Sequence, residues 1–398
     1  MADPLFLGVN SAYHESAAVI VRGREVCFAL EEERLTRVKH GKPARVDNAA
    51  ELPWGAIDAC LEAVGATLDD LDGVAYSLVP GLRQRTIGVD DYPLTDPEGF
   101  GSEAGEARFD AEVRSVRRLL AERAADGESF AEQVKLLSHH RCHAAGAFYG
   151  GPFHSAAALV IDGIGEHETA WLGVGRGDKL ERIEGIVYPH SIGMLWEQLA
   201  RYVGFSEYDA GKAMGLAAYG DATRFGHVID KLFLVPDPEG GEPGSSAPPF
   251  IIDGALARFR GDLSGWESLF GPARAPDEEL IMDGRHADVA AAVQVATEEA
   301  LLATATRLYR ALERRGEAQA ARNLVYAGGV ALNCVANARL ERHGPFEAIY
   351  IPGPANDAGT ALGAALDLAA RAGFARARPA APLPAALGPG YDAAAIDA

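Results

Sequence analysis

The sequence predicts an α/β protein of two similar lobes, because one pattern of strands and turns occurs twice along the chain. Each copy has three short apolar runs, separated by a polar or glycine-rich turn and then by a tighter turn. Short apolar runs bounded by turn residues are typical of strands in a meander, and a repeated unit indicates a duplicated architecture. The runs lie at 5–9, 17–21 and 26–30 in the first copy, and at 157–161, 169–174 and 180–187 in the second.

Helices and loops are expected in the remaining segments. The segment 53–64 begins with proline and ends before Gly65, which is typical of a helix. Amphipathic or alanine-rich composition predicts further helices at 104–125, 287–315 and 356–372. Two stretches with few strand signals and several prolines and glycines, 81–105 and 236–249, are read as loops.

These elements suggest how the chain is divided. We expect a first lobe at 1–155, a second lobe at 156–374 with an insertion near 221–286, and a linker or tail at 375–398, where alanine and proline are frequent.

The composition excludes some classes of protein. A formal net charge of −20 argues against general binding to nucleic acid or to an anionic membrane surface, because both need a basic face. The four cysteines form no CxxC pair, which favours a reducing cytoplasm over a disulfide framework. There is no apolar run of about 18 residues, the length expected of a membrane helix.

A histidine cluster is the strongest candidate for a site. His139 and His143 are four residues apart, so on a helix their rings lie on one face, as two imidazoles that bind one metal would. Asp162 follows the next predicted strand and supplies a carboxylate, and this set suits iron, manganese or zinc. Asp357 opens a predicted helix and is either a fourth ligand or an N-cap. A helical histidine pair also occurs in many proteins that bind no metal at that position.

Two glycine-rich stretches are candidates for binding phosphate. Gly328 and Gly329 lie between a predicted strand and a helix start near Asn333, where free backbone amides suit an anion, although a simple tight turn is the alternative. The stretch 209–220 contains three glycines, Gly215 among them, with Lys212 as a point charge for phosphate or as an ordinary surface lysine.

Two further features lie near the start of the chain. His14, in the turn between the first two strands, is a candidate general base near neutral pH, with a solvated surface histidine as the alternative. A basic run that contains Lys39 follows the third strand and is a candidate local anion site in an otherwise acidic chain.

Taken together and in order, these motifs resemble the O-carbamoyltransferases of the NodU and CmcH type. The similarity extends over nearly the whole chain and includes Asn10 with His14, the stretch 138–145, Asp162-Gly163 with Gly165-Glu166, and the stretch 211–220. It continues through 327–334 to Asn356-Asp357-Ala358-Gly359. Six motifs in a fixed order are far more specific than any one of them.

The resemblance implies an actin-like, sugar-kinase-like fold, in which two ribonuclease-H-like lobes enclose a central cleft. It also implies a metal site, with Fe(II) or another divalent ion such as manganese or zinc held by His139, His143, Asp162 and Asp357. His14 would be the catalytic base. The residues that would bind the donor are Lys39, Gly163, Gly165, Lys212, Gly215, Gly328, Gly329 and Asn333.

The implied reaction is transfer of a carbamoyl group to a hydroxyl of a small natural product, such as an antibiotic sugar or polyol. The donor is carbamoyl-adenylate, made from carbamoyl phosphate and ATP with Mg, or carbamoyl phosphate itself. Family members usually carry a second, YrdC-like domain that makes the adenylate, and the sequence shows none. We therefore expect a fragment, or a transfer domain served by a partner, and a second copy of the chain is a further partner to test.

Two rival interpretations remain open at this stage. One is a kinase or ATPase with the same fold, and the other is a non-catalytic nucleotide-binding lobe that needs a partner. The sequence does not name the acceptor or the metal bound in the cell.

Overall fold

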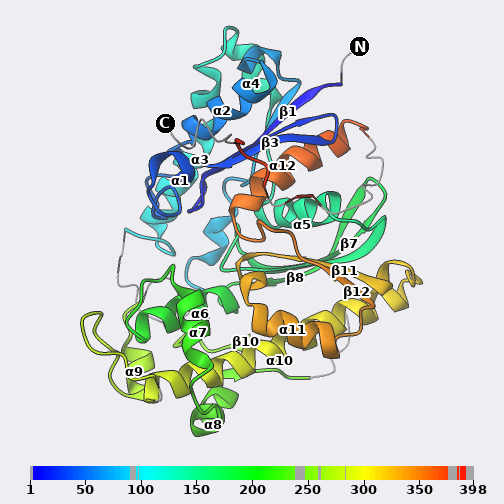
Figure 1. Ribbon diagram of the computed structural model, residues 1–398. Helices are drawn as coiled ribbons and strands as arrows, with labels where there is room; N and C mark the ends of the chain where they lie inside the picture. Colours follow the sequence, from blue (N-terminus) through cyan, green and yellow to red (C-terminus); the bar gives the residue numbers. More distant parts are fainter. Residues whose placement is uncertain are drawn as a thin grey trace.

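Two five-stranded sheets form the centre of the protein, as Figure 1 shows for the computed structural model. The strand order is β3-β2-β1-β4-β5 in the first sheet and β8-β7-β6-β11-β12 in the second. The first sheet contains β1 (Leu5–Asn10), β2 (Ala17–Arg22), β3 (Glu25–Glu31), β4 (Gly73–Tyr76) and β5 (Val134–Leu136). The second contains β6 (Ser155–Ile161), β7 (Glu168–Arg176), β8 (Lys179–Val187), β11 (Asn323–Ala327) and β12 (Ala348–Tyr350).

The structure describes most of the chain. The described residues are 3–89, 96, 98–237, 247–258, 261–282, 284–374, 383–384 and 386–390. Parts of the two predicted loops and most of the predicted tail at 375–398 therefore lie outside the described residues.

The two sheets have the same topology as well as the same order. In each, the first three strands form an antiparallel meander, and the first strand also pairs in parallel with the fourth, which pairs in parallel with the fifth. This repeat confirms the predicted actin-like, sugar-kinase-like fold of two ribonuclease-H-like lobes. The predicted boundary between the lobes, after residue 155, stays a prediction.

Two helices, α5 (His139–Gly150) and α12 (Ala358–Arg371), lie between the sheets and pack against each other (Figure 1). Their approach is close because glycines stand at the contacts. A Cβ on Gly363 of α12 would lie 1.7 Å from the carbonyl oxygen of Cys142 in α5. The contact between α12 and β1 is equally close, because a Cβ on Gly8 of β1 would lie 2.0 Å from the carbonyl oxygen of Ala361. The α5–α12 packing therefore fixes the N-termini of both helices, which carry candidate site residues.

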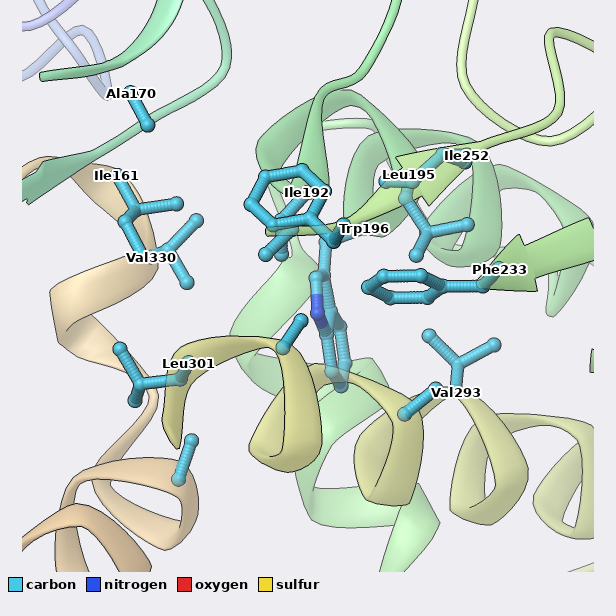
Figure 2. Close-up of a cluster of buried hydrophobic side chains, with 14 of the residues drawn as sticks. Ile161, Ala170, Ile192, Leu195, Trp196, Phe233, Ile252, Val293, Leu301 and Val330 are labelled. Atoms are coloured by element: carbon cyan, nitrogen blue, oxygen red, sulfur yellow. The ribbon is translucent and has the colours of Figure 1, made fainter. Parts of the chain in front are cut away.

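A large apolar core supports the second lobe around α6 (Ile192–Tyr202) and α10 (Arg285–Arg314). Figure 2 shows the Trp196 ring pointing from α6 toward α10, among Phe233, Ile252 and Val293. Its indole nitrogen donates a hydrogen bond to Thr297 Oγ1 over 3.0 Å. This core also contains Ile161, the residue before Asp162, so it holds the end of β6 in place.

The other elements surround these layers. The first lobe adds α1 (Glu33–Thr36), α2 (Trp54–Val64), η1 (Leu68–Asp70), η2 (Arg83–Thr86), α3 (Glu103–Ala121) and α4 (Gly127–Gln133). The rest are α7 (Ala210–Ala217), α8 (Thr223–Leu232), β9 (Phe233–Leu234), β10 (Ile251–Ile252), α9 (Ser264–Phe270), η3 (Ala320–Arg322), η4 (Gly329–Leu332) and α11 (Cys334–His343).

The predicted helix at 104–125 is observed as α3, which ends four residues earlier than predicted. The helix α3 ends at Ala121, and the Asp126 side chain accepts a hydrogen bond from the Ser129 amide over 3.2 Å, which caps a separate helix, α4. A capping aspartate starts a new helix because its carboxylate satisfies a free backbone amide. Within the described residues, no helix is long and apolar enough to cross a membrane.

The close packing of α5 on α12 yields a stability prediction. Gly363→Ala should destabilise the protein by about 1–3 kcal/mol or more, because the added Cβ meets backbone that cannot move aside. Gly226→Ala in α8 is the matched control, since its Cβ would meet nothing within 4 Å and should stabilise by up to about 1 kcal/mol. Urea unfolding measures both, and a neutral Gly363→Ala would contradict the tight contact.

Candidate metal centre and active-site cavity

Four buried side chains from three different elements meet between the lobes. His139 and His143 come from the first two turns of α5, and Asp162 follows the last residue of β6. Asp357 precedes the first residue of α12. The candidate ligand atoms of these residues all lie within 4.8 Å of one another.

The distances fit a single metal ion. His139 Nε2 lies 3.3 Å from Asp162 Oδ2 and 3.3 Å from Asp357 Oδ1. His143 Nε2 lies 3.2 Å and 3.4 Å from the same two oxygens. Neighbouring ligand atoms around an ion with bonds of about 2.1 Å are separated by roughly 3.0–3.4 Å. Two imidazoles and two carboxylates also match the ligand preference of iron, manganese or zinc.

Backbone groups hold these side chains in place. His139 Nδ1 lies 3.3 Å from the Ser77 carbonyl oxygen, so an Nδ1–H would leave Nε2 free to bind a metal. Asp162 Oδ1 accepts a hydrogen bond from the Gly329 amide over 2.9 Å. Glu15 Oε2 accepts one from the Asp357 amide, also over 2.9 Å. Backbone groups therefore orient the side chains of His139 and Asp162, and Glu15 holds the backbone of Asp357.

The charges at this site also favour a cation. Burial disfavours charge on His139, but Asp357 and Asp162 outweigh it and raise the pKa of His139 well above its usual value. Burial likewise opposes ionisation of Asp162, yet its hydrogen bonds to His139 and His143 hold the pKa of Asp162 well below its usual value. Among the described residues, no lysine or arginine forms an ion pair with Asp162 or Asp357. A divalent cation would supply the missing positive charge.

A cavity of about 270 Å³ opens beside these ligands. Asp162 and Asp357 form part of its wall, together with residues from both lobes. The other polar residues of the wall are Tyr13, His14, Glu15, His40, Arg83, Glu197, Glu207, Tyr208, Asn333 and Asn356. The candidate metal site therefore faces a space large enough for a small ligand.

His14 lies in this wall next to the metal site. Its Nδ1 is 3.7 Å from Asp357 Oδ2 and 3.9 Å from Glu15 Oε2. Burial tends to lower the pKa of His14, but the carboxylates of Glu15 and Asp357 outweigh burial and raise it. The ring also packs edge-on against Tyr208 from the second lobe, with 5.3 Å between centroids. His14 thus contacts residues of both lobes.

The glycine loop reaches the cavity, but several of its polar groups are already engaged. Gly328 has a φ of 95°, a left-handed conformation that favours glycine, and a Cβ there would lie 2.2 Å from the Ile161 carbonyl oxygen. The Gly329 amide is bound to Asp162. Asn333 Oδ1 accepts from the Ala336 amide, and its Nδ2 donates to Gln294. The loop holds Asp162 and starts α11, and its role toward a donor stays a prediction.

The remaining predicted donor residues do not all meet at the cavity. Gly163 lines it, while Gly165 packs behind the histidines. Lys39 and Lys212 are exposed, and their Nζ atoms lie 3.1 Å and 3.0 Å from the Asp209 carboxylate. Gly215 is exposed as well. Lys39, Lys212 and Gly215 are absent from the cavity wall.

The sequence reasoning assigned no role to two residues of the site. Glu166 is buried and accepts hydrogen bonds from the His139 and Val79 amides, each over 3.0 Å, so it joins the lobes beneath the ligands. Arg83 forms a buried bidentate ion pair with Glu106 and donates to the Tyr13 hydroxyl. Glu166 belongs to the glycine-rich motif that begins at Asp162, whereas nothing in the local sequence marks Arg83.

Comparison with known proteins identifies relatives of the chain. Residues 6–366 match the family described as carbamoyltransferase N-terminus. The protein sll1178 of Synechocystis is 34% identical over 376 residues, which cover 91% of this chain and 56% of that protein. Nodulation protein NolNO of Sinorhizobium fredii is 30% identical over 361 residues, which cover 90% of this chain and 46% of that protein. The chain thus spans about half the length of these curated relatives.

A solved structure is also similar. It is the (R)-2-hydroxyglutaryl-CoA dehydratase component A of Acidaminococcus fermentans, with 16% identity and a TM-score of 0.46. The match covers 93% of this chain and 100% of that one.

The ligand geometry yields a prediction about metal content. After loading with Fe(II) without oxygen and desalting, the protein should retain about one metal ion per chain. His139→Ala and Asp357→Asn should each retain much less, because one of the four ligands is lost. Elemental analysis by mass spectrometry measures the content.

His227→Ala is the control for this experiment, since His227 is exposed on α8. It should bind metal as the unaltered protein does. Equal metal content in His139→Ala and His227→Ala would show that the four-residue site is not where the ion binds.

Proposed function

This chain belongs to the carbamoyltransferase family, and we propose that it transfers a carbamoyl group to a hydroxyl of a small natural product. An antibiotic sugar or polyol is the acceptor class in this proposal. The donor is carbamoyl-adenylate, formed from carbamoyl phosphate and ATP, or carbamoyl phosphate itself. The observation that carries the proposal is that His14 and two of the four candidate metal ligands, Asp162 and Asp357, line one cavity.

His14 supports the proposal through its position. It lines the cavity but is not one of the four candidate ligands, so its ring is available to a substrate. Its neighbours Glu15 and Asp357 stabilise positive charge on the ring, which is the charge that a base acquires when it accepts a proton. In the proposed reaction His14 accepts the proton of the acceptor hydroxyl as the oxygen attacks.

The candidate metal ligands would act on the carbamoyl donor. His139, His143, Asp162 and Asp357 would hold a divalent metal, which when bound would act as a Lewis acid toward an oxygen of the carbamoyl group or its phosphate. The Gly329 amide orients the Asp162 carboxylate, and Glu15 holds the backbone of Asp357 by accepting a hydrogen bond from its amide. The residues of the site therefore divide into a donor side and a proton-accepting side.

The bonds balance in this scheme. The acceptor oxygen forms a bond to the carbamoyl carbon, and the bond from that carbon to the phosphate oxygen breaks. The leaving group is AMP from the adenylate route or inorganic phosphate from the direct route. The hydroxyl proton ends on His14. In the adenylate route, we propose that a YrdC-like domain or a partner protein supplies the donor.

Substitution of His14 tests the proposal. With carbamoyl-adenylate and a panel of amino sugars and polyols, His14→Asn should transfer the carbamoyl group about 10²- to 10⁴-fold more slowly, because the general base is lost. Its metal content should stay unchanged, since His14 is not a candidate ligand. Mass spectrometry of the carbamoylated product and assay of released AMP measure the rate.

His154→Asn is the matched control, because His154 is exposed and lies outside the cavity wall. It should be as active as the unaltered protein. Equal rates for His14→Asn and His154→Asn would refute the base assignment. Phosphorylated product from ATP without carbamoyl phosphate would instead support a kinase with this fold.

A further inference from the structure

His140 is a buried histidine that the proposed reaction does not use. It lies between the two histidine ligands on α5, is 0% exposed, and is not part of the cavity wall. Among the residues that the structure describes, neither of its ring nitrogens has a hydrogen-bond partner. Buried polar atoms without partners are uncommon, because the hydration they lose is not replaced.

The nearest carboxylate to His140 belongs to Asp162. His140 Nε2 lies 4.0 Å from Asp162 Oδ2, which is beyond hydrogen-bond distance but within reach of a small side-chain shift. The same oxygen lies 3.3 Å from His139 Nε2 and 3.2 Å from His143 Nε2. The other oxygen, Oδ1, is already bound by the Gly329 amide. Three imidazoles therefore surround one carboxylate oxygen, and only two belong to the candidate ligand set.

The turn after β6 restricts the His140 ring. A Cβ on Gly165 would lie 3.3 Å from His140 Cε1 and Nδ1, and 3.2 Å from His139 Cβ. The backbone of this turn therefore covers both rings, which limits the space into which His140 could rotate. This packing, rather than contact with the donor, accounts for the position of Gly165.

We propose that His140 is a positioning residue of the metal centre, which orients Asp162 by donating a hydrogen bond to its Oδ2 when a metal is bound. The inference rests on the proposed function, since it takes the four-residue metal site as given. Carboxylate ligands are commonly hydrogen-bonded by a neighbouring group, and loss of that group weakens metal binding. His140 acts through Asp162 and does not touch the substrates.

Two substitutions test this role with measurements other than activity. His140→Leu removes both unpaired nitrogens at similar volume, so the melting temperature of the metal-free protein should stay equal or rise. Its affinity for Mn²⁺ should fall about 10- to 100-fold, as for other partners of metal ligands. His140→Gln keeps an N–H donor and should lose less affinity. Electron paramagnetic resonance of free Mn²⁺ gives the affinities, and calorimetry gives the melting temperatures.

Two results for His140→Leu would contradict its positioning role. An unchanged Mn²⁺ affinity in His140→Leu would overturn the proposal. A lower melting temperature of metal-free His140→Leu, or failure of that variant to fold, would show that the ring is structural and would overturn it as well. Weak Mn²⁺ binding by the unaltered protein would instead contradict the metal centre of the proposed function, which distinguishes the two failures.

Discussion

Asp162 and Asp357 are buried between the lobes, and among the described residues no lysine or arginine forms an ion pair with either. Burial of two carboxylates costs free energy unless positive charge and hydrogen bonds compensate. His139 and His143 provide this compensation only while protonated, whereas a bound cation would provide it with neutral rings. The surrounding structure adds hydrogen bonds, since Asp162 Oδ1 accepts one from the Gly329 amide, and the backbone amide of Asp357 donates one to the Glu15 carboxylate.

The fold brings these groups together from distant parts of the chain. The helix α12 comes late in the sequence, yet it packs against β1, β2 and β4 of the first sheet and so places Asp357 beside His14 (Figure 1). Glycines at the α5–α12 contact allow the close approach that this placement needs. Glu166 also links the lobes, because its carboxylate accepts hydrogen bonds from the Val79 amide and from the His139 amide at the N-terminus of α5. The geometry of the site and the packing of the lobes are therefore linked.

Much of this could be predicted from local sequence. Apolar runs bounded by turns gave the strands of both meanders, and the spacing of His139 and His143 gave their common helical face, because these signals depend on neighbours in the chain. Asp357 as a ligand came from the family resemblance, since a local reading leaves an N-cap equally open. The position of Lys39 was not predictable, because its pairing with Asp209 depends on how the two lobes meet, whereas Lys212 pairs with the same aspartate from three residues further along the chain. The end of the helix at 104–125 was predicted to within four residues, but the short helix α4 that Asp126 caps was not predicted.

Anomalous X-ray diffraction from crystals of the Fe(II)-loaded protein, recorded above and below the iron absorption edge, is the most direct test of the metal centre. The account predicts one strong anomalous peak between the lobes, about 2.0–2.3 Å from Nε2 of both His139 and His143 and from a carboxylate oxygen of Asp162 and of Asp357. A peak coordinated by other residues, or fully loaded crystals with no peak between the lobes, would contradict it.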